Sequence, residues 1–224
     1  MIEVISASRL TMDDFWSKSA LGLSLRRLAF DSKRLAVHLA FQNSAGLPTV
    51  YNSRISTANQ SEVLLFVHDD VWIDDYFVVD RVLAGLQSFD IIGVAGSRRR
   101  VPGQRAWHYI GPGQPQEREH LSGAVGHGKN PFGRVSSFGP APAECELLDG
   151  VFLAVKLRTL LDRAVRFDPM FDFHFYDLDF CRSARQAGLR LGTWPICLTH
   201  QSGGNFASEA WTAACGKYVQ KWGD

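Results

Sequence analysis

The chain has 224 residues, of which 46% are hydrophobic and 21% are charged, and its formal net charge is +1. This length is enough for one large domain with a complete hydrophobic core, and the composition excludes an intrinsically disordered chain. The near-zero net charge argues against a protein that mainly coats nucleic acid or an anionic membrane. The four cysteines form no C-x-x-C pair, so the sequence signals neither a zinc knuckle nor a thioredoxin-like site.

The start of the chain, MIEVIS, lacks the basic segment and the apolar run of a signal peptide. No stretch approaches the ~20 consecutive apolar residues that a membrane-spanning helix needs. We therefore expect a cytoplasmic protein with reduced thiols and no integral membrane segment. The sequence shows no internal repeat and no linker between domains, which predicts a single domain over residues 1–224.

Short apolar strands alternate with helical segments over the first hundred residues. Strands are predicted at residues 2–6, 35–41, 63–67 and 90–96, and helices at residues 11–30, at residues 46–59 and from a cap at Asp74 to Phe89. This alternation predicts an α/β fold with a mostly parallel central sheet and helices on both of its faces. Ligands of such sheets bind beyond the carboxyl ends of the strands.

The second half of the chain begins with an irregular segment. Residues 97–145 are rich in glycine and proline, and we expect a long loop that is either functional or disordered. After it, the patterns predict a strand at residues 146–156, a helix at 175–188 that Gly188 ends, a strand at 189–200 and a helix at 208–222.

Three polar residues, His68, Asp69 and Asp70, follow the apolar strand 63–67 directly. They could cap the following helix, or they could hold a metal ion. Asp74 and Asp75 are already placed to serve that helix, which favours the metal. Carboxylate oxygens suit Mg²⁺ and Mn²⁺, and an imidazole suits the softer end of that range.

Two further segments carry side chains that could take part in catalysis or metal binding. Asp177 and Asp179 lie two residues apart, so they cannot share one helix face. One could cap the helix while the other points into a cleft, or both could be charges that the helix dipole favours. His200 follows a strand, and it is either a structural group or a ligand. The predicted strand order could bring it to the same sheet edge as Asp70.

Three segments taken together resemble the family 2 glycosyltransferases with the GT-A fold, over nearly the whole chain. They are the HDD motif at residues 68–70, the stretch LDGVFLAVK at 148–156 and the stretch FDFHFYDLDFCRSARQAGLRLGTWPICLTH at 171–200. The stretch at 148–156 is similar to the strand that passes under the donor phosphates, and the stretch at 171–200 is similar to the acceptor-side helix and the strand after it. The resemblance is weakest over residues 97–145. It implies a Rossmann-like domain in which residues 1–96 bind the nucleotide and residues 97–224 bind the acceptor.

The resemblance also implies roles for single residues. Asp70 matches the metal-binding acid of the family's D-x-D motif, and His200 matches a histidine that completes a site for Mn²⁺ or Mg²⁺. Asp69 would be the matching acid if the register were one residue earlier. His68 occupies the position of the first aspartate, which is a departure from the motif. The nucleotide-sugar would contact Ser6, Ala7, Asn43, Asn52, His68, Asp69, Asp149 and Gly150, and the acceptor would contact Trp107 and Asp179.

By the same resemblance, Asp177 matches the base that takes the proton of the acceptor hydroxyl. The implied reaction is metal-dependent and inverting, and it moves a sugar from a nucleoside-diphosphate sugar to a glycan, a lipid-linked or a protein acceptor, as in polysaccharide biosynthesis. No nucleic acid partner is implied. Alternatives are a non-catalytic sugar-nucleotide or carbohydrate-binding module, a phosphoester hydrolase and a sugar-1-phosphate nucleotidyltransferase. The last would carry a glycine-rich basic loop after the first strand, where this chain has SASRLTMDD.

Overall fold

The computed structural model describes residues 1–111, 113–203 and 208–223. The elements of the first half are β1 (Ile2–Ala7), α1 (Met12–Lys18), α2 (Ala20–Arg27), the 3-10 helix η1 (Ala29–Asp31), β2 (Leu35–Ala40), α3 (Leu47–Asn52), β3 (Val63–Val67), β4 (Val71–Ile73), α4 (Val78–Ser88), β5 (Ile91–Gly93), β6 (Ala95–Ser97) and β7 (Tyr109–Gly111). Those of the second half are β8 (Gln114–Pro115), η2 (Arg118–His120), β9 (Leu121–His127), β10 (Arg134–Gly139), β11 (Ala143–Cys145), β12 (Leu147–Leu148), β13 (Phe152–Lys156), α5 (Leu157–Asp162), α6 (Tyr176–Gln186), β14 (Leu191–Thr193), β15 (Leu198–His200) and α7 (Glu209–Trp222).

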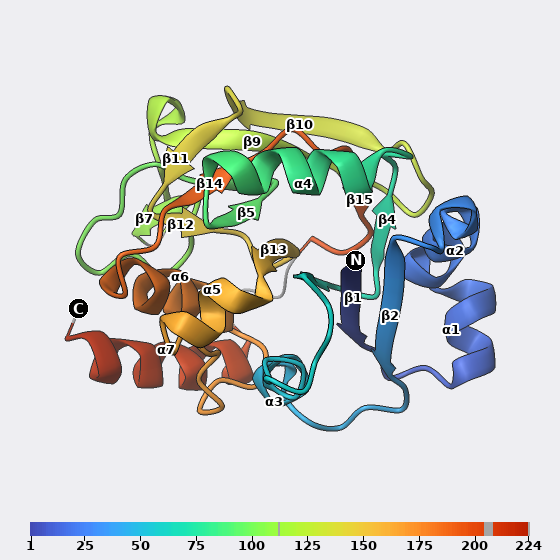
Figure 1. Cartoon of the computed structure of the whole chain (residues 1–224). Coiled ribbons are helices and arrows are strands. Elements are labelled where there is room, and N and C mark those ends of the chain that lie inside the picture. Colours follow the sequence, from blue (N-terminus) through green and yellow to red (C-terminus); the bar gives the residue numbers. More distant parts are fainter. Residues whose placement is uncertain (112, 204–207, 224) are drawn as a thin grey trace.

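A central sheet with the strand order β11-β14-β5-β13-β3-β1-β2 organises the molecule (Figure 1). Strands β1, β2, β3, β5 and β14 run in one direction, and β13 and β11 run in the other. The predicted mostly parallel central sheet is therefore confirmed. Every residue of β3 is buried, which requires cover on both faces because alternate side chains point to opposite faces. Helix α3 packs on β1, α4 on β5 and β13, and α5 on β13.

A second sheet, with the order β12-β6-β9-β15-β4 and with β10 paired to β9, lies beside the central one. It corrects the expectation of a long loop at residues 97–145, because β9 and β10 form an antiparallel ribbon there. The strands expected at 90–96, 146–156 and 189–200 are each divided, with one part in each sheet. The chain therefore crosses between the sheets repeatedly, for example at the β3–β4, β5–β6, β12–β13 and β14–β15 connections.

The helix expected at residues 11–30 is interrupted at Ser19. The Ser19 hydroxyl donates to the Phe15 carbonyl at 2.8 Å and accepts the Gly22 amide at 2.9 Å. It thus serves the end of α1 and the start of α2 at once, which explains why two helices stand where the periodicity predicts one. The helix expected at 46–59 is shorter than predicted, since α3 ends at Asn52.

Asp74 does not cap the helix that follows it. Its side chain is buried and accepts the Thr199 hydroxyl at 2.6 Å, which ties β4 to β15. Asp75 serves the helix instead, because its Oδ1 accepts the Phe77 amide at 2.8 Å just before α4. The helices expected near residues 175–188 and 208–222 are present as α6 and α7. Within the described ranges, no helix combines the length and the hydrophobicity of a membrane span.

We predict that Ser19→Ala lowers the free energy of unfolding by about 1 kcal/mol, because the start of α2 loses its capping oxygen. Ser17→Ala is the matched control. The Ser17 hydroxyl is exposed and donates to the Asp13 carbonyl within the helix, so this change should stay within about 0.5 kcal/mol. Urea denaturation of both variants measures the difference, and equal effects would contradict a capping role for Ser19.

Candidate functional site

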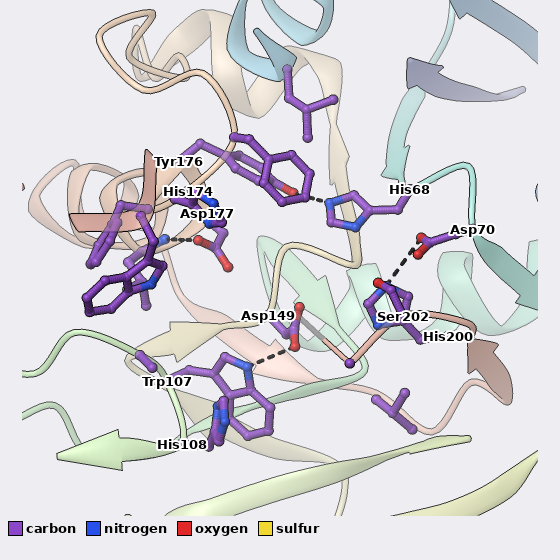
Figure 2. A pocket seen from close by; sticks show the side chains of 18 of the residues that line it. His68, Asp70, Trp107, His108, Asp149, His174, Tyr176, Asp177, His200 and Ser202 are labelled. Carbon is purple, nitrogen blue, oxygen red and sulfur yellow. Dashed lines mark hydrogen bonds and ion pairs between the residues drawn. The ribbon is translucent and has the colours of Figure 1, made fainter. Parts of the chain in front are cut away.

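A cavity of about 450 Å³ opens where the two sheets meet (Figure 2). Its lining comes mainly from the end of β1, the β3–β4 and β12–β13 connections, the 97–145 segment, the first turn of α6 with the residues before it, and the end of β15, with single residues from α3 and α7. The lining residues that carry polar or aromatic side chains include His68, Asp69, Asp70, Arg105, Trp107, His108, His127, Asp149, Phe173, His174, Phe175, Tyr176, Asp177, His200, Ser202 and Trp211. The cavity therefore lies at the predicted edge, beyond the carboxyl ends of β1 and β3.

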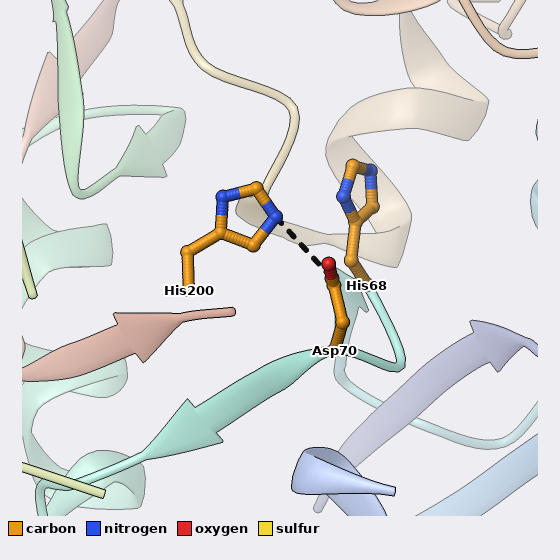
Figure 3. A group of neighbouring side chains, drawn as sticks. All are labelled: His68, Asp70 and His200. Carbon is orange, nitrogen blue, oxygen red and sulfur yellow. Dashed lines mark ion pairs between the residues drawn. The ribbon is translucent and has the colours of Figure 1, made fainter. Parts of the chain in front are cut away.

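His68, Asp70 and His200 form a compact group in this cavity (Figure 3). One potential ligand atom from each lies within 4.8 Å of the others. His200 Nε2 lies 3.2 Å from Asp70 Oδ1, and the Ser202 hydroxyl lies 3.1 Å from the same nitrogen. The structure thus brings Asp70 and His200 together, as the sequence predicts. It adds His68 to them, and Asp69 is not a member of the group.

Burial and charge act against each other in this group. Burial opposes the charge on Asp70, but the hydrogen bond and charge of His200 outweigh it and lower the Asp70 pKa to about 2. Burial likewise opposes the charge on His200, but its bond to Asp70 raises the His200 pKa. Burial lowers the pKa of His68, which keeps that imidazole neutral. Two imidazoles and one carboxylate form a donor set that suits a divalent transition-metal ion, so the residues fit a metal.

Tyr176 fixes the orientation of His68. Its hydroxyl donates to the Gly150 carbonyl at 2.8 Å, and its oxygen lies 2.8 Å from His68 Nε2. Because the single hydroxyl proton points to Gly150, the proton in the second bond comes from Nε2. This assignment leaves Nδ1 of the neutral ring unprotonated, which is the form of nitrogen that binds metals. Such a partner on the outer nitrogen is typical of metal-binding histidines.

The Gly150 peptide also holds Asp177. The amide of Gly150 donates to Asp177 Oδ2 at 3.0 Å, while its carbonyl accepts from Tyr176. Asp177 Oδ1 accepts the Leu178 amide at 2.9 Å. Phe175, which precedes this first turn of α6, has a left-handed backbone with φ of 66°. A non-glycine residue in this region is strained, and such strain is common at functional sites.

Asp177 is only partly exposed, and it faces the cavity. Burial raises its pKa to about 7, and the negative charge of nearby Asp149 adds to the shift. The two backbone amides that it accepts act in the opposite direction. A carboxylate with a pKa near neutrality is suited to accept a proton at physiological pH.

Asp149 joins the 97–145 segment to the cavity floor. Its Oδ2 accepts the indole N–H of Trp107 at 2.8 Å, and its Oδ1 accepts the Val151 amide at 2.9 Å. The Trp107 ring also packs edge-on against Phe138. Trp107 therefore lines the cavity, although its side chain is mostly buried.

The other predicted residues divide into two sets. Ala7 and Asp69 line the cavity, and burial raises the pKa of Asp69. Ser6, Asn43, Asn52 and Asp179 do not belong to the lining.

Ser6, Asn43, Asn52 and Asp179 are buried in the fold or bonded to other parts of it, outside the cavity. Ser6 is buried within β1. Asn43 bonds to the backbone of Ala45, and Asn52 bonds to that of Phe167. Asp179 is buried, with Lys221 Nζ at 2.7 Å and Trp222 Nε1 at 2.9 Å. These contacts give Asp179 a structural role between α6 and α7 instead of contact with an acceptor.

Several lining residues were not assigned from the sequence, above all Tyr176, Phe173, His174 and Arg105. The cluster of aromatic and histidine residues in FDFHFYD, directly before the predicted base, was the available signal for the first three. The sequence gives no indication that Arg105 lines the cavity, because nothing in the glycine-rich stretch around it shows which side chains point inward.

No protein-family model matches the sequence, and no curated protein matches it. Solved structures do match. A structure of GalNAc-T7 with UDP, GalNAc and Mn²⁺ has a TM-score of 0.55 at 11% identity, over 100% of this chain and 48% of that chain. A structure of S. aureus TarS has a TM-score of 0.50 at 13% identity, over 90% of this chain and 36% of that chain. The chain thus spans half or less of the length of each of these two structures.

The chain has a GT-A-like glycosyltransferase fold. The resemblance inferred from the three motifs is therefore confirmed at the level of the fold. In this GT-A-like fold, the His68–Asp70–His200 group and Asp177 lie in one cavity, although more than one hundred residues separate Asp70 from Asp177 in the sequence.

We predict that Gly150→Ala disturbs the site. A Cβ at this position would overlap the Tyr176 hydroxyl and lie 2.8 Å from the Asp177 Cβ, so the first turn of α6 must shift. Overpacking of this kind lowers the free energy of unfolding by about 1–3 kcal/mol. Gly216→Ala in α7 is the control, because open space surrounds it and no loss is expected. Thermal unfolding measures both, and an unchanged Gly150→Ala variant would contradict the close packing.

Proposed function

We propose that the chain transfers a sugar from a nucleoside-diphosphate sugar to an acceptor hydroxyl. The supporting observation is the pairing, within one cavity, of the His68–Asp70–His200 group with the raised-pKa carboxylate of Asp177. The first supplies ligands for a divalent ion, and the second supplies a base. The GT-A-like fold is a fold of sugar-transferring enzymes, and it agrees with this combination.

The metal ligands in this proposal are Asp70, His200 and His68. When bound, the ion neutralises the negative charge that develops on the leaving diphosphate. Two nitrogen ligands disfavour Mg²⁺, which prefers oxygen, so we propose Mn²⁺ or a similar transition-metal ion. Mn²⁺ and UDP are both named for the GalNAc-T7 structure, and they are the first pair to test here.

Asp177 is the proposed base. The acceptor oxygen attacks the anomeric carbon while the bond from that carbon to the phosphate oxygen breaks. The hydroxyl proton passes to the Asp177 carboxylate, and the nucleoside diphosphate leaves. The Gly150 and Leu178 amides hold the carboxylate in place during this transfer. One displacement without a covalent intermediate inverts the configuration of the sugar carbon.

The residues around the reacting groups have proposed roles as well. Ala7, Asp69, Asp149 and the Gly150 peptide form the donor side, and Trp107 forms part of the acceptor side. A glycan, lipid-linked or protein acceptor, a role in polysaccharide biosynthesis and a cytoplasmic location all stay predictions. So does the division into a nucleotide half and an acceptor half, although residues from both halves line the cavity.

We predict that Asp70→Ala abolishes metal-dependent nucleotide binding. Calorimetric titration with UDP, GDP and dTDP, each with Mn²⁺, Mg²⁺ or no metal, identifies the nucleotide. Loss of an ionic ligand should weaken binding at least about tenfold. Asp168→Ala is a control, because that half-buried carboxylate pairs with Lys221 outside the cavity. Equal nucleotide binding by wild type and Asp70→Ala would refute the metal site.

We predict that Asp177→Asn separates turnover from binding. The amide can still accept the Gly150 N–H, but it cannot take a proton, so the transfer rate should fall about 10²–10⁴-fold. Nucleotide affinity should stay within about twofold. If Asp177→Asn keeps most of the transfer rate, Asp177 is not the base. If the wild-type protein binds nucleotide but shows no turnover, the chain is better described as a non-catalytic module.

The raised pKa of Asp177 also predicts how stability depends on pH. The pKa is about 7 in the folded chain, against 3.8 in the unfolded one, so the folded state binds the proton more tightly. The contribution of this group to stability is fully present below the unfolded pKa and is lost as pH rises to about 7. Without metal, the free energy of unfolding of Asp177→Asn minus that of wild type should therefore increase by about 1–3 kcal/mol when the pH is raised from about 5 to about 8. Urea denaturation at both pH values measures it, and a pH-independent difference would contradict the shift.

A further inference from the structure

The described lining of the cavity carries more carboxylate side chains than lysine or arginine side chains, although the proposed substrate is an anion. Asp69, Asp70, Asp149 and Asp177 contribute four carboxylates. A nucleoside diphosphate carries further negative charge, of which a divalent ion compensates only a part. Among the described lining residues, Arg105 is the one lysine or arginine. Apart from the metal ion and the histidines, this guanidinium is therefore the group in the described lining that can neutralise the negative charge of a bound substrate.

Arg105 has no partner of its own among the residues that the structure describes. No carboxylate lies within ion-pair distance of its guanidinium, and no hydrogen bond engages it. Two other arginines of the same half of the chain are paired: Arg99 lies 2.7 Å from Glu117, and Arg185 lies 3.1 Å from Glu146. Arg105 is also exposed at the cavity, so a ligand can reach it.

The backbone that carries Arg105 is fixed on both sides. The buried side chain of Gln104 accepts the Val101 amide at 2.9 Å and donates to the carbonyls of Ala106 at 2.9 Å and Trp107 at 3.1 Å. The Trp107 indole is bound to Asp149 at 2.8 Å. The loop around Arg105 is thus anchored to the cavity floor, which reduces the entropy lost when the side chain binds a ligand.

We propose that Arg105 is the anion-binding residue of the cavity and that it binds phosphate oxygens of the donor. This inference rests on the proposed sugar transfer and adds a residue and a charge requirement to it. The planar fork of a guanidinium matches two oxygens of a phosphate or carboxylate. The diphosphate is the favoured source because every molecule of the proposed donor carries it. An acidic group on the acceptor is the other source of the same chemistry.

The test is calorimetric titration of UDP, UMP and uridine with Mn²⁺ into wild type, Arg105→Ala and Arg105→Lys. If another nucleotide proves to be the ligand, its diphosphate, monophosphate and nucleoside replace this series. Loss of the charged hydrogen bonds should weaken diphosphate binding about 10–100-fold in the alanine variant and less in the lysine variant. Nucleoside binding should not change. Arg163→Ala, outside the cavity at the end of α5, is the matched control.

A second arm locates the anion if diphosphate binding is unchanged. Glucuronate and glucose 6-phosphate, with glucose as the neutral reference, are titrated in the presence of Mn²⁺ and UDP. A loss confined to the acidic sugars in Arg105→Ala supports anion binding on the acceptor. If Arg105→Ala binds the nucleotides and the acidic sugars as tightly as wild type, while Asp70→Ala still loses nucleotide binding, the role of Arg105 is overturned but the proposed function is not. Wild type that binds no nucleotide with Mn²⁺ overturns the proposed function as well.

Discussion

The peptide unit of Gly150 is the constraint on which the rest of the site depends. Its amide holds Asp177, and its carbonyl holds the Tyr176 hydroxyl, which in turn holds His68. A single rigid plane therefore sets the positions of the proposed base and of one proposed metal ligand. A side chain on residue 150 would collide with Tyr176, so only glycine allows α6 to approach this closely. The base and the metal ligand are therefore oriented by hydrogen bonds to one common backbone unit.

The two sheets explain why these groups meet. The chain leaves the central sheet at the end of β3, presents His68 and Asp70, and enters the second sheet as β4. It makes the reverse crossing between β12 and β13, where Asp149 and Gly150 lie. His200 ends β15, which is paired with β4 and β9. The β3–β4 and β12–β13 crossings each place a short polar connection at the seam, and there the partly buried acids gain the neighbours that shift their pKa values.

The sequence predicted the parts of this site that follow from strand ends. The apolar run 63–67 located Asp70, and the resemblance of residues 171–200 located Asp177 and His200. The features that it could not predict depend on contacts between residues far apart in the sequence. The ribbon of β9 and β10 is stabilised by pairing with distant strands, and its glycine content hides that pairing in the local pattern. Asp179 resembled Asp177 in the sequence, but the helix turns it away from the cavity toward Lys221. The role of Tyr176 depends on Gly150, 26 residues away.

The most direct test of this account is pulsed electron paramagnetic resonance of the protein with bound Mn²⁺, before and after UDP is added. The account predicts couplings to two histidine nitrogens in the metal-bound protein, one of which disappears in His200→Ala. It also predicts couplings to phosphorus once UDP binds. A spectrum without nitrogen couplings would contradict the proposed ligands. One without phosphorus couplings at saturating UDP would contradict the donor site at this metal.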